Sequence, residues 1–403
     1  MAVVIVGTLD TKGAEVAFVR DLIRAAGLDT IVVDATVLGD PAFRPDVPRE
    51  EVYAAAGVLF HQVRATADRG QAMTLAAKGV AAVVAKLHAA GRVDGVFGLG
   101  GSAGTTIGTA AMRALPYGIP KLMVSTLASG QVAPYVGVRD ICMMYSVTDL
   151  AGLNRFTRQI LANAAHAMIG MVRHQPLAAS PTDSDRPLVM ATMFGVTTPC
   201  VEAARKQVEA AGYEVLVFHA TGMGGRTMEA MIRDGLAVGV LDLTTTELAD
   251  ELVGGTLTAG PDRLTAAAIR GVPQVISVGA LDMVNFGPPD TVPKKFDGRR
   301  FYHHNPTVTL MRTTPEENDR LGKEIAEKAC AARGPTAILL PLRGVSAIDR
   351  EGSPFWWPEA DAALFQSIRN WVSPAVKVIE FDMHINDPAF APLAAAELLR
   401  MMG

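Results

Sequence analysis

Short apolar runs rich in β-branched residues alternate with longer alanine-rich segments along this chain, and this alternation constrains the fold more than any other feature. In the first half, the predicted strands are residues 2–6, 30–34, 95–99 and 121–125, and the predicted helices are 15–26, 69–90 and 105–114. Apolar strands separated by helices are typical of parallel sheets that are covered on both faces. The sequence therefore predicts an α/β protein with mainly parallel sheets.

The pattern restarts after a polar, proline-containing stretch, "HQPLAASPTDSDRP" at residues 174–187, which we interpret as a linker. Beyond it, "LVMATMFGVTTPCVEAARKQVEAAGYEVLVFHA" parallels the N-terminal "AVVIVGTLDTKGAEVAFVRDLIRAAGLDTIVVDA". Further strands are predicted at residues 237–241, 274–278, 337–340 and 376–381. A length of 403 residues also exceeds what one ordinary core supports. We predict two similar α/β domains, 1–180 and 186–403, with a ligand cleft between them.

Composition and charge limit the kinds of partner and the cellular compartment that we expect for this protein. The formal net charge is −4 and no block of Lys or Arg stands out, so nothing favours nucleic-acid binding. The three cysteines, Cys142, Cys200 and Cys330, are far apart, which argues against a zinc ribbon or a disulfide framework. The N-terminus resembles a first strand, and no apolar run approaches about 18 residues. We expect a cytoplasmic protein without a membrane partner.

The loop "GTLDTKGAE" at residues 7–15 follows the first predicted strand. It is not a Walker A loop, because Lys12 precedes Gly13. Backbone amides near a helix start, two hydroxyls and a lysine nevertheless suit a phosphate or carboxylate. Alternatively, Asp10 or Thr11 merely caps a helix that begins near Gly13. The candidate ligands in this loop are Gly7, Thr8, Asp10, Thr11 and Lys12.

A second glycine-rich loop, "GLGGSAGTT" at residues 98–106, matches GxGxxA, the weaker form of the dinucleotide fingerprint. The next strand ends in Ser125 and Thr126 without an acidic residue, so NAD is not expected. Glycines and hydroxyls at a helix start suit phosphate oxygens or a carboxylate. The alternative is a tight turn that lets the helix pack closely on the sheet. The candidate ligands are Gly100, Gly101, Ser102, Gly104, Thr105 and Thr106.

The same loop also contains G-x-S-x-G around Ser102, in the strand-to-helix context of a nucleophile elbow. The histidines of the first domain, at positions 61, 88, 166 and 174, lie in helical segments or at the linker. A triad would therefore need His384 from the other domain. A serine hydrolase stays the rival interpretation.

Two loops of the second domain are further candidates for anion binding. "HATGMGGRT" at residues 219–227 carries Arg226, and Asp242 follows Gly222 by the spacing of a dinucleotide site, although the glycine pattern is imperfect. "LPLRGVSAID" at residues 340–349 carries Arg343 and Ser346. Arginine offers a planar fork to carboxylate or phosphate, but either arginine could equally be a solvated charge.

Two stretches carry side chains suited to acid–base chemistry. In "IEFDMHINDP", Asp382 and His384 would share one face of a strand, as a carboxylate-oriented base or as two metal ligands. A zinc site would need a third ligand such as His304 or His219, so the metal is left unknown. In "RRFYHHNPTVTLMRTTPEEN", His304 and Arg312 are the next candidates, although a lone exposed histidine is more often without a catalytic role.

Six phrases of the sequence together resemble the Tm-one-like ATP-binding domain family: "GTLDTKGAE", "GLGGSAGT", "VGALDMVNFG", "HNPTVTLMRTT", "LPLRGVSAID" and "HIND". The resemblance extends from residue 7 to residue 387. It implies two Rossmann-like subdomains, ATP binding and a homodimer. It attaches no reaction to the chain, and we carry nucleotide binding only onto residues 7–13 and 100–106.

Together these features predict a nucleotide- or anion-binding cleft lined by loops 7–13, 100–106, 222–226 and 343–346. Lys12, Arg226 and Arg343 would offset the ligand's charge, and His384 oriented by Asp382 would act as a general base. ATP, with Mg²⁺ as a candidate companion, is the expected cofactor. The substrate would be a small carboxylate or phosphorylated metabolite undergoing transfer or cleavage. The alternatives are the serine hydrolase and a non-enzymatic ATP-binding sensor or interaction module.

Overall fold

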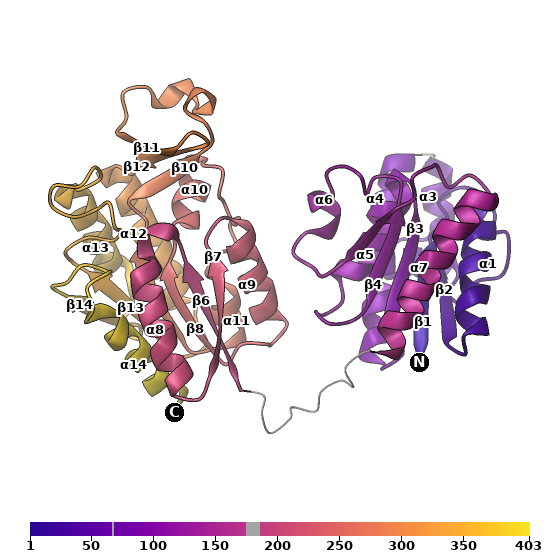
Figure 1. The fold of residues 1–403 in the computed structure, drawn as a ribbon, viewed down its shortest axis with the longest axis horizontal. Coiled ribbons are helices and arrows are strands. Elements are labelled where there is room, and N and C mark those ends of the chain that lie inside the picture. Colours follow the sequence, from indigo (N-terminus) through magenta and orange to yellow (C-terminus); the bar gives the residue numbers. More distant parts are fainter. Residues whose placement is uncertain (67, 175–185) are drawn as a thin grey trace. The chain divides into compact units, whose positions relative to one another are not determined.

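The computed structural model describes residues 1–66, 68–174 and 186–403. The chain divides into two compact units, Met1–Thr182 and Asp183–Gly403, which we describe separately (Figure 1). The predicted linker at 174–187 lies almost wholly outside the described residues.

A five-stranded parallel sheet forms the centre of the N-terminal unit (Figure 1). Its strand order is β2 (Asp29–Asp34), β1 (Ala2–Gly7), β3 (Gly95–Gly100), β4 (Lys121–Ser125) and β5 (Cys142–Tyr145). The helices are α1 (Leu9–Ala25), α2 (Arg49–Ala55), α3 (Phe60–Thr66), α4 (Arg69–Ala89), α5 (Ser102–Arg113), α6 (Ala133–Val136) and α7 (Arg155–Arg173). The order reverses between β1 and β3, and in open α/β sheets ligands bind beyond the strand ends at such a reversal.

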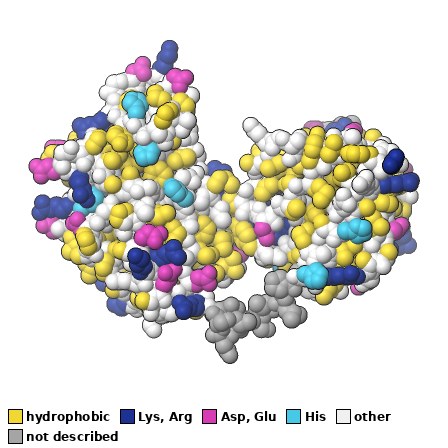
Figure 2. Space-filling view, in the orientation of Figure 1, with side chains coloured by type: hydrophobic (Ala, Val, Ile, Leu, Met, Phe, Trp, Pro, Cys, Tyr) yellow, Lys and Arg dark blue, Asp and Glu magenta, His cyan; other side chains and the backbone are white. Residues whose placement is uncertain are grey.

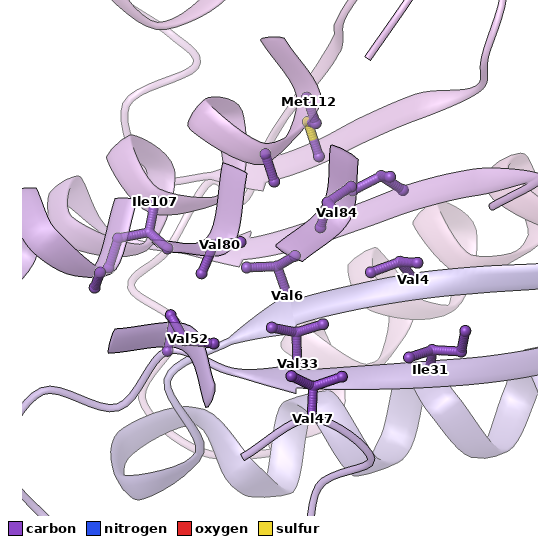
Figure 3. Packing of buried hydrophobic residues seen from close by; sticks show 14 of the residues in the cluster. Val4, Val6, Ile31, Val33, Val47, Val52, Val80, Val84, Ile107 and Met112 are labelled. Carbon is purple, nitrogen blue, oxygen red and sulfur yellow. The ribbon is translucent and has the colours of Figure 1, made fainter. Parts of the chain in front are cut away.

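Alternation of side chains along the strands divides the core of this unit into two layers. Val4 and Val6 of β1 point towards α2, α4 and α5, where they meet Val80, Val84 and Ile107 (Figure 3). The intervening residues Val3 and Ile5 pack with α1 and α7 on the opposite face. Near-continuous apolar strands are thus explained by burial on both faces.

Helix α4 is long and apolar enough to cross a bilayer by length and composition, the one such helix within the described ranges. Its residues Ala72, Ala76, Val80 and Val84 are buried in the core of the N-terminal unit. A core helix of a globular domain passes the same test, and one face of α4 packs in this way, with 33% of the apolar window buried.

A six-stranded parallel sheet forms the centre of the C-terminal unit, in the order β14 (Lys377–Phe381), β13 (Thr336–Pro341), β9 (Gln274–Gly279), β8 (Gly239–Thr244), β6 (Leu188–Met193) and β7 (Glu214–His219). Its α-helices are α8 (Thr198–Ala210), α9 (Met223–Arg233), α10 (Glu247–Val253), α11 (Ala266–Arg270), α12 (Pro315–Cys330), α13 (Pro358–Trp371) and α14 (Phe390–Met402). Helices α8 and α14 cover one face, and α9 to α13 cover the other. The order reverses between β6 and β8, as it does between β1 and β3.

A small antiparallel sheet, which the sequence did not predict, is inserted after β9. It consists of β10 (Met283–Phe286), β12 (Val308–Arg312) and β11 (Phe301–Asn305), with short 3₁₀ turns at Pro289–Thr291 and Lys294–Phe296. A third 3₁₀ turn, Gly195–Thr197, leads from β6 into α8.

The predicted α/β class with mainly parallel sheets in two domains is confirmed. Two predicted helix starts are later than the observed ones: α5 begins at Ser102 and α1 at Leu9, although non-helical backbone at Lys12 separates the first turn of α1 from the helix that continues from Gly13. The strand predicted at 237–241 is observed at Gly239–Thr244. The predicted interdomain cleft stays a prediction.

Candidate functional site

A cavity of about 480 Å³ lies within the N-terminal unit, where β1 and β3 end. Two of the four predicted loops meet here, because the carboxyl ends of neighbouring parallel strands share one edge of the sheet. The lining residues are Thr8, Asp10, Thr11, Lys12, Val37, Leu38, Arg69, Met73, Gly100, Gly101, Ser102, Ala103, Gly104 and Asp149. The switch point of this sheet therefore holds a cavity of the size of a small-ligand site.

The amino end of α5 presents free amides to this cavity. The helix has Gly101 as its N-cap, without a side-chain capping bond. Within the described part of the chain, nothing accepts a hydrogen bond from the amides of residues 102–104, the first turn of the helix. Unpaired amides at a helix start, with the helix dipole behind them, favour a bound anion.

Glycine is required where β3 turns into α5. Gly100 has φ +153°, a backbone conformation that side chains disfavour, and a Cβ at Gly104 would lie 2.9 Å from the carbonyl oxygen of Leu99. At Gly101, by contrast, a Cβ would have only the Thr126 hydroxyl nearby, at 3.7 Å. The tight-turn alternative thus holds at Gly100 and Gly104, while Gly101 leaves room over the free amides.

The start of α1, at the other side of the cavity, is already occupied by the chain's own groups. The amide of Leu9 donates to Asp34 at 3.3 Å, and that of Asp10 donates to the Thr36 hydroxyl at 3.2 Å. Burial raises the pKa of Asp34. The capping alternative for Asp10 is wrong, since its carboxylate instead accepts from the amide of Gly39 at 3.1 Å. Loop 7–13 therefore offers side chains rather than helix-start amides.

Two cations and two carboxylates line the cavity. Across the described ranges, neither Lys12 nor Arg69 has a hydrogen-bond or ion-pair partner. Asp10 and Asp149 each accept one backbone hydrogen bond, from Gly39 and Leu150 respectively. Arg69 was missed from the sequence, because it is brought to the cavity from the start of a helix thirty residues before the glycine loop. An anion here would meet two cations that form no ion pair within the described residues, although the two carboxylates of the lining offset their formal charge.

Three hydroxyl-bearing residues of the glycine loop were predicted to bind the ligand, but only one of them lines the cavity. Thr105 is buried and its hydroxyl bonds Ser125 at 2.7 Å, while the hydroxyl of Thr106 bonds the carbonyl oxygen of Ser102 at 2.9 Å. Neither threonine lines the cavity, so direct phosphate contacts by these two side chains are not supported. Ser102 does line it, but none of the described lining residues is a histidine. The N-terminal unit thus supplies Ser102 with no base inside this cavity.

The glycine loop of the C-terminal unit does bind an anion, which is the chain's own Glu247. The amides of Gly222 and Gly225 donate to the Glu247 carboxylate at 2.7 and 3.0 Å. Its other oxygen contacts the buried Arg263 at 2.7 Å, and Arg263 also holds Asp242. The spacing of Asp242 from Gly222 therefore reflects an internal ion-pair network and not a dinucleotide site. Arg226 is exposed and outside this network.

The predicted pairing of Asp382 with His384 is wrong. Strand β14 ends at Phe381, so the two residues do not share a strand face. Asp382 is exposed and forms a two-point ion pair with Arg343, which holds the pKa of that carboxyl below its usual value. His384 is buried, with Nε2 2.8 Å from the carbonyl oxygen of Ser346 and Nδ1 accepting from the amide of Asn386. Burial lowers the pKa of His384, and both ring nitrogens have structural partners.

Arg312 and Ser346 belong to a buried polar cluster rather than to a ligand site. The guanidinium of Arg312 contacts Asp361 at 2.6 Å, and Ser346 donates to Asp282 at 2.7 Å. Burial, together with the charge of nearby Asp349, raises the pKa of Asp282 to about 8. The pKa of Asp361 is raised to about 7, chiefly by burial. The family phrases containing Asp282, Arg312 and Ser346 thus converge on one packed cluster.

His304 lies exposed on β11, at a bulge in the small antiparallel sheet. The described residues contain no group of three or more His, Cys, Asp or Glu side chains able to hold a metal ion. A second cavity, of about 580 Å³, lies beyond β13 and is lined in part by Arg343, Trp356 and Asp361. In the face drawn in Figure 2, basic and acidic side chains are interspersed on the C-terminal unit.

Comparisons with known proteins agree over the whole chain. The models of an uncharacterised protein family, UPF0261, match residues 1–177 with the N-terminal domain and 186–402 with the C-terminal domain. A UPF0261 protein of Clostridium tetani is 52% identical over 401 residues, covering 99% of this chain and 98% of that protein. One of Rhizobium meliloti is 49% identical, covering 97% of each. None of these names states a ligand or a reaction.

A tomato protein, the ToMV susceptible protein tm-1(GCR26), is 39% identical over 98% of this chain and 55% of its own length. It supports the Tm-one-like resemblance. Among solved structures, UDP-N-acetylglucosamine 2-epimerases of Rickettsia bellii and Methanocaldococcus jannaschii are 11% identical, with TM-scores of 0.23 and 0.22. They cover 99% of this chain and 95% and 93% of their own. At these scores we base no functional argument on them.

Proposed function

The chain belongs to the uncharacterised protein family UPF0261, and from this premise we propose that its N-terminal unit binds a phosphorylated ligand, with ATP as the first candidate. One observation carries the proposal: the free amides of residues 102–104 line the same cavity as the unpaired cations Lys12 and Arg69. Amides at a helix start combined with free cations are what phosphate oxygens require. The resemblance to a Tm-one-like ATP-binding domain favours ATP over a small carboxylate.

Mg²⁺ is the metal that these residues fit. Asp10 and Asp149 line the cavity, and each has one carboxylate oxygen without a backbone partner. Mg²⁺ is usually held by one or two carboxylates together with the phosphates of the ligand, which needs no cluster of protein ligands. When bound, it would screen the two carboxylates from the phosphates. We therefore expect ATP affinity to rise with Mg²⁺ and to fall when EDTA removes it.

Isothermal titration with ATP, ADP, NAD and inorganic phosphate tests the proposal, on the wild type and on Gly101→Asp. The substitution places a carboxylate over the free amides, and the space around Gly101 admits it. Asp is also a favourable N-cap, so the helix should remain folded. We expect ATP affinity to fall at least about tenfold, because the new charge occupies the anion's place.

Gly195→Asp is the control, since Gly195 also lies in a turn between a parallel strand, β6, and a helix, and a Cβ there has nothing within 4 Å. It should leave ATP affinity unchanged. Equal affinity of wild type and Gly101→Asp would contradict the proposed site, and absence of ATP binding to the wild type would contradict the proposed ligand.

The three remaining interpretations separate experimentally. An enzyme acting on a small carboxylate or phosphorylated metabolite should turn ATP over once its substrate is added, whereas a sensor or interaction module should bind ATP without turnover. A serine hydrolase should be labelled at Ser102 by a fluorophosphonate. The lack of a histidine among the described cavity residues makes us expect no labelling. A homodimer and a cytoplasmic location stay expectations.

A further inference from the structure

A shallower hollow of about 360 Å³ lies beside the cavity at the start of α5. It is lined by Thr126, Tyr145, Val147, Thr148 and Asp149, at the ends of β4 and β5. Asp149 lines both spaces, so the two lie next to each other at this residue. The second hollow differs from the first in chemistry, because its lining includes an aromatic ring and a branched aliphatic side chain but no basic residue.

The turn that forms this hollow is strained. Val147 has φ +65°, which is rare for a β-branched residue. The amide of Thr148 donates to the carbonyl oxygen of Ser146 at 2.7 Å and closes a three-residue γ-turn. A γ-turn with positive φ at its central residue is the less stable of the two γ-turn types. The Ser146 hydroxyl donates to the carbonyl oxygen of Thr148 at 2.7 Å and holds the turn in place. Such conformations persist at ligand sites more often than elsewhere.

The strained turn leaves two apolar side chains open to solvent. Tyr145 is 40% exposed and Val147 is 51% exposed. Within the described ranges, the Tyr145 ring stacks on no other ring and its hydroxyl has no hydrogen-bond partner. An unpartnered aromatic face beside a cavity is well suited to stack with a flat ring of a ligand.

The hollow is also tied to the helix that carries the free amides. The amide of Thr126 donates to the carbonyl oxygen of Gly100 at 3.3 Å, and that of Ser146 donates to Ser125 at 3.1 Å. The loops after β3, β4 and β5 are thereby joined into one rim. A group held by the α5 amides and a group held by Tyr145 can belong to a single molecule.

We propose that this hollow is the subsite for a flat, weakly polar ring of the ligand whose phosphate lies at the start of α5, with Tyr145 stacking on the ring and Val147 contacting its edge. The inference rests on the proposed function and specifies which class of phosphorylated ligand the site binds. Such a ligand has a phosphate part and a ring part, and a bare phosphate chain would fill only one of the two spaces. The competing location for the ring is the aliphatic wall of the first cavity, which includes Leu38.

The test compares ATP with tripolyphosphate, which has the same phosphate chain without the nucleoside, by isothermal titration. On the wild type, ATP should bind at least about tenfold tighter. Tyr145→Ala should remove most of this difference while leaving tripolyphosphate affinity unchanged, and Tyr145→Phe should retain it because the ring is kept. Phe156→Ala, which removes an exposed aromatic of α7 that lines neither space, is the control and should bind both probes as the wild type does.

Val147→Gly provides a second variant that keeps the fold, since glycine adopts positive φ without strain. It should raise the melting temperature of the N-terminal unit and weaken ATP about threefold or more without affecting tripolyphosphate. Equal affinities of the wild type for the two probes, or loss of the ATP advantage in Leu38→Ala but not in Tyr145→Ala, would overturn the inference while the phosphate site stands. Failure of both probes to bind the wild type would overturn the proposed function itself.

Discussion

At the level of single residues, a buried arginine of the C-terminal unit is paired with several buried carboxylates. Arg263 is fully buried and contacts Asp242 at 2.6 Å, Glu247 at 2.7 Å and Glu229 at 3.4 Å. These carboxylates in turn accept hydrogen bonds from the backbone amides of the glycine loop and from those of Leu264 and Ala266 at the start of α11. One cation thus fixes three segments, and its removal would leave three buried acids facing one another.

Arg263→Ala should therefore destabilise the C-terminal unit by about 3–5 kcal/mol, the usual cost of breaking a buried ion pair from one side. All three tryptophans of the chain, at positions 356, 357 and 371, lie in this unit, so tryptophan fluorescence during urea unfolding follows it alone. Arg226→Ala, which removes an exposed arginine of the neighbouring helix, should change stability by less than about 0.5 kcal/mol. Similar unfolding midpoints for the two variants would refute the structural role of Arg263.

Sequence patterns indicated which loops form the candidate site of the N-terminal unit but not which of their residues line its cavity. The two N-terminal loops could be predicted to meet, because both follow strands of one parallel sheet. The pattern Asp382-x-His384 misled, because alternation applies only while the strand continues and β14 ends at Phe381. The partner of Asp382 is Arg343, thirty-nine residues earlier, and no local spacing could reveal that pairing.

At the level of elements, the position of α5 depends on how closely its first turn approaches β3. The strands that were predicted with bounds agree with the observed ones to within about three residues, because their apolar runs mark them, whereas β5 was not predicted. Helix starts were less accurate, because they are set by backbone geometry and capping rather than by hydrophobic period. The small antiparallel sheet escaped prediction because its strands are only four or five residues long. The close approach of α5 to β3 is visible only in three dimensions.

Gly104→Ala tests this approach. The added Cβ would lie 2.9 Å from the carbonyl oxygen of Leu99, so α5 must shift away from the strand. We expect the N-terminal unit to lose about 1–3 kcal/mol and ATP affinity to fall, because the free amides move with the helix. The loss of stability is measured by thermal unfolding followed by circular dichroism. The transition of the N-terminal unit is the one that tryptophan fluorescence does not report. Gly170→Ala in α7, where a Cβ meets nothing within 4 Å, should instead be neutral or stabilising; equal losses in both variants would contradict the close-packing argument.

At the level of the whole molecule, the described residues of the C-terminal unit include four buried acids with raised pKa values, one of which is Glu229. Burial is the main cause in each, and it raises the pKa of Asp250 to about 7, of Asp282 to about 8 and of Asp361 to about 7. In the unfolded chain these groups titrate near pH 4, so between pH 4 and pH 8 the folded unit holds more protons than the unfolded one. Raising the pH through 7 to 8 must therefore destabilise this unit.

The pH window that isolates these carboxyls is 6.5 to 8.5. Below this window, His384 has the opposite effect on the pH dependence of stability. Burial lowers its pKa, so protonation of His384 favours the unfolded state. Acids whose pKa is lowered by ion pairs, such as Asp382, are ionised in both states throughout the window. Within it, each buried acid contributes a slope of up to about 1.4 kcal/mol per pH unit. Tryptophan fluorescence during urea unfolding should show the C-terminal midpoint falling from pH 6.5 to 8.5, with the steepest change below about pH 8.

Asp282→Asn identifies the source of this dependence, because the amide mimics the protonated carboxyl and cannot ionise at high pH. Asn at this position can still accept the hydrogen bond that Ser346 donates. The urea unfolding midpoint of the variant should depend less on pH than that of the wild type. The variant should therefore become more stable relative to the wild type as the pH rises to 8.5. An unchanged slope in Asp282→Asn would show that Asp282 is ionised in the folded protein, so that Arg312 compensates its charge despite the nearby Asp349.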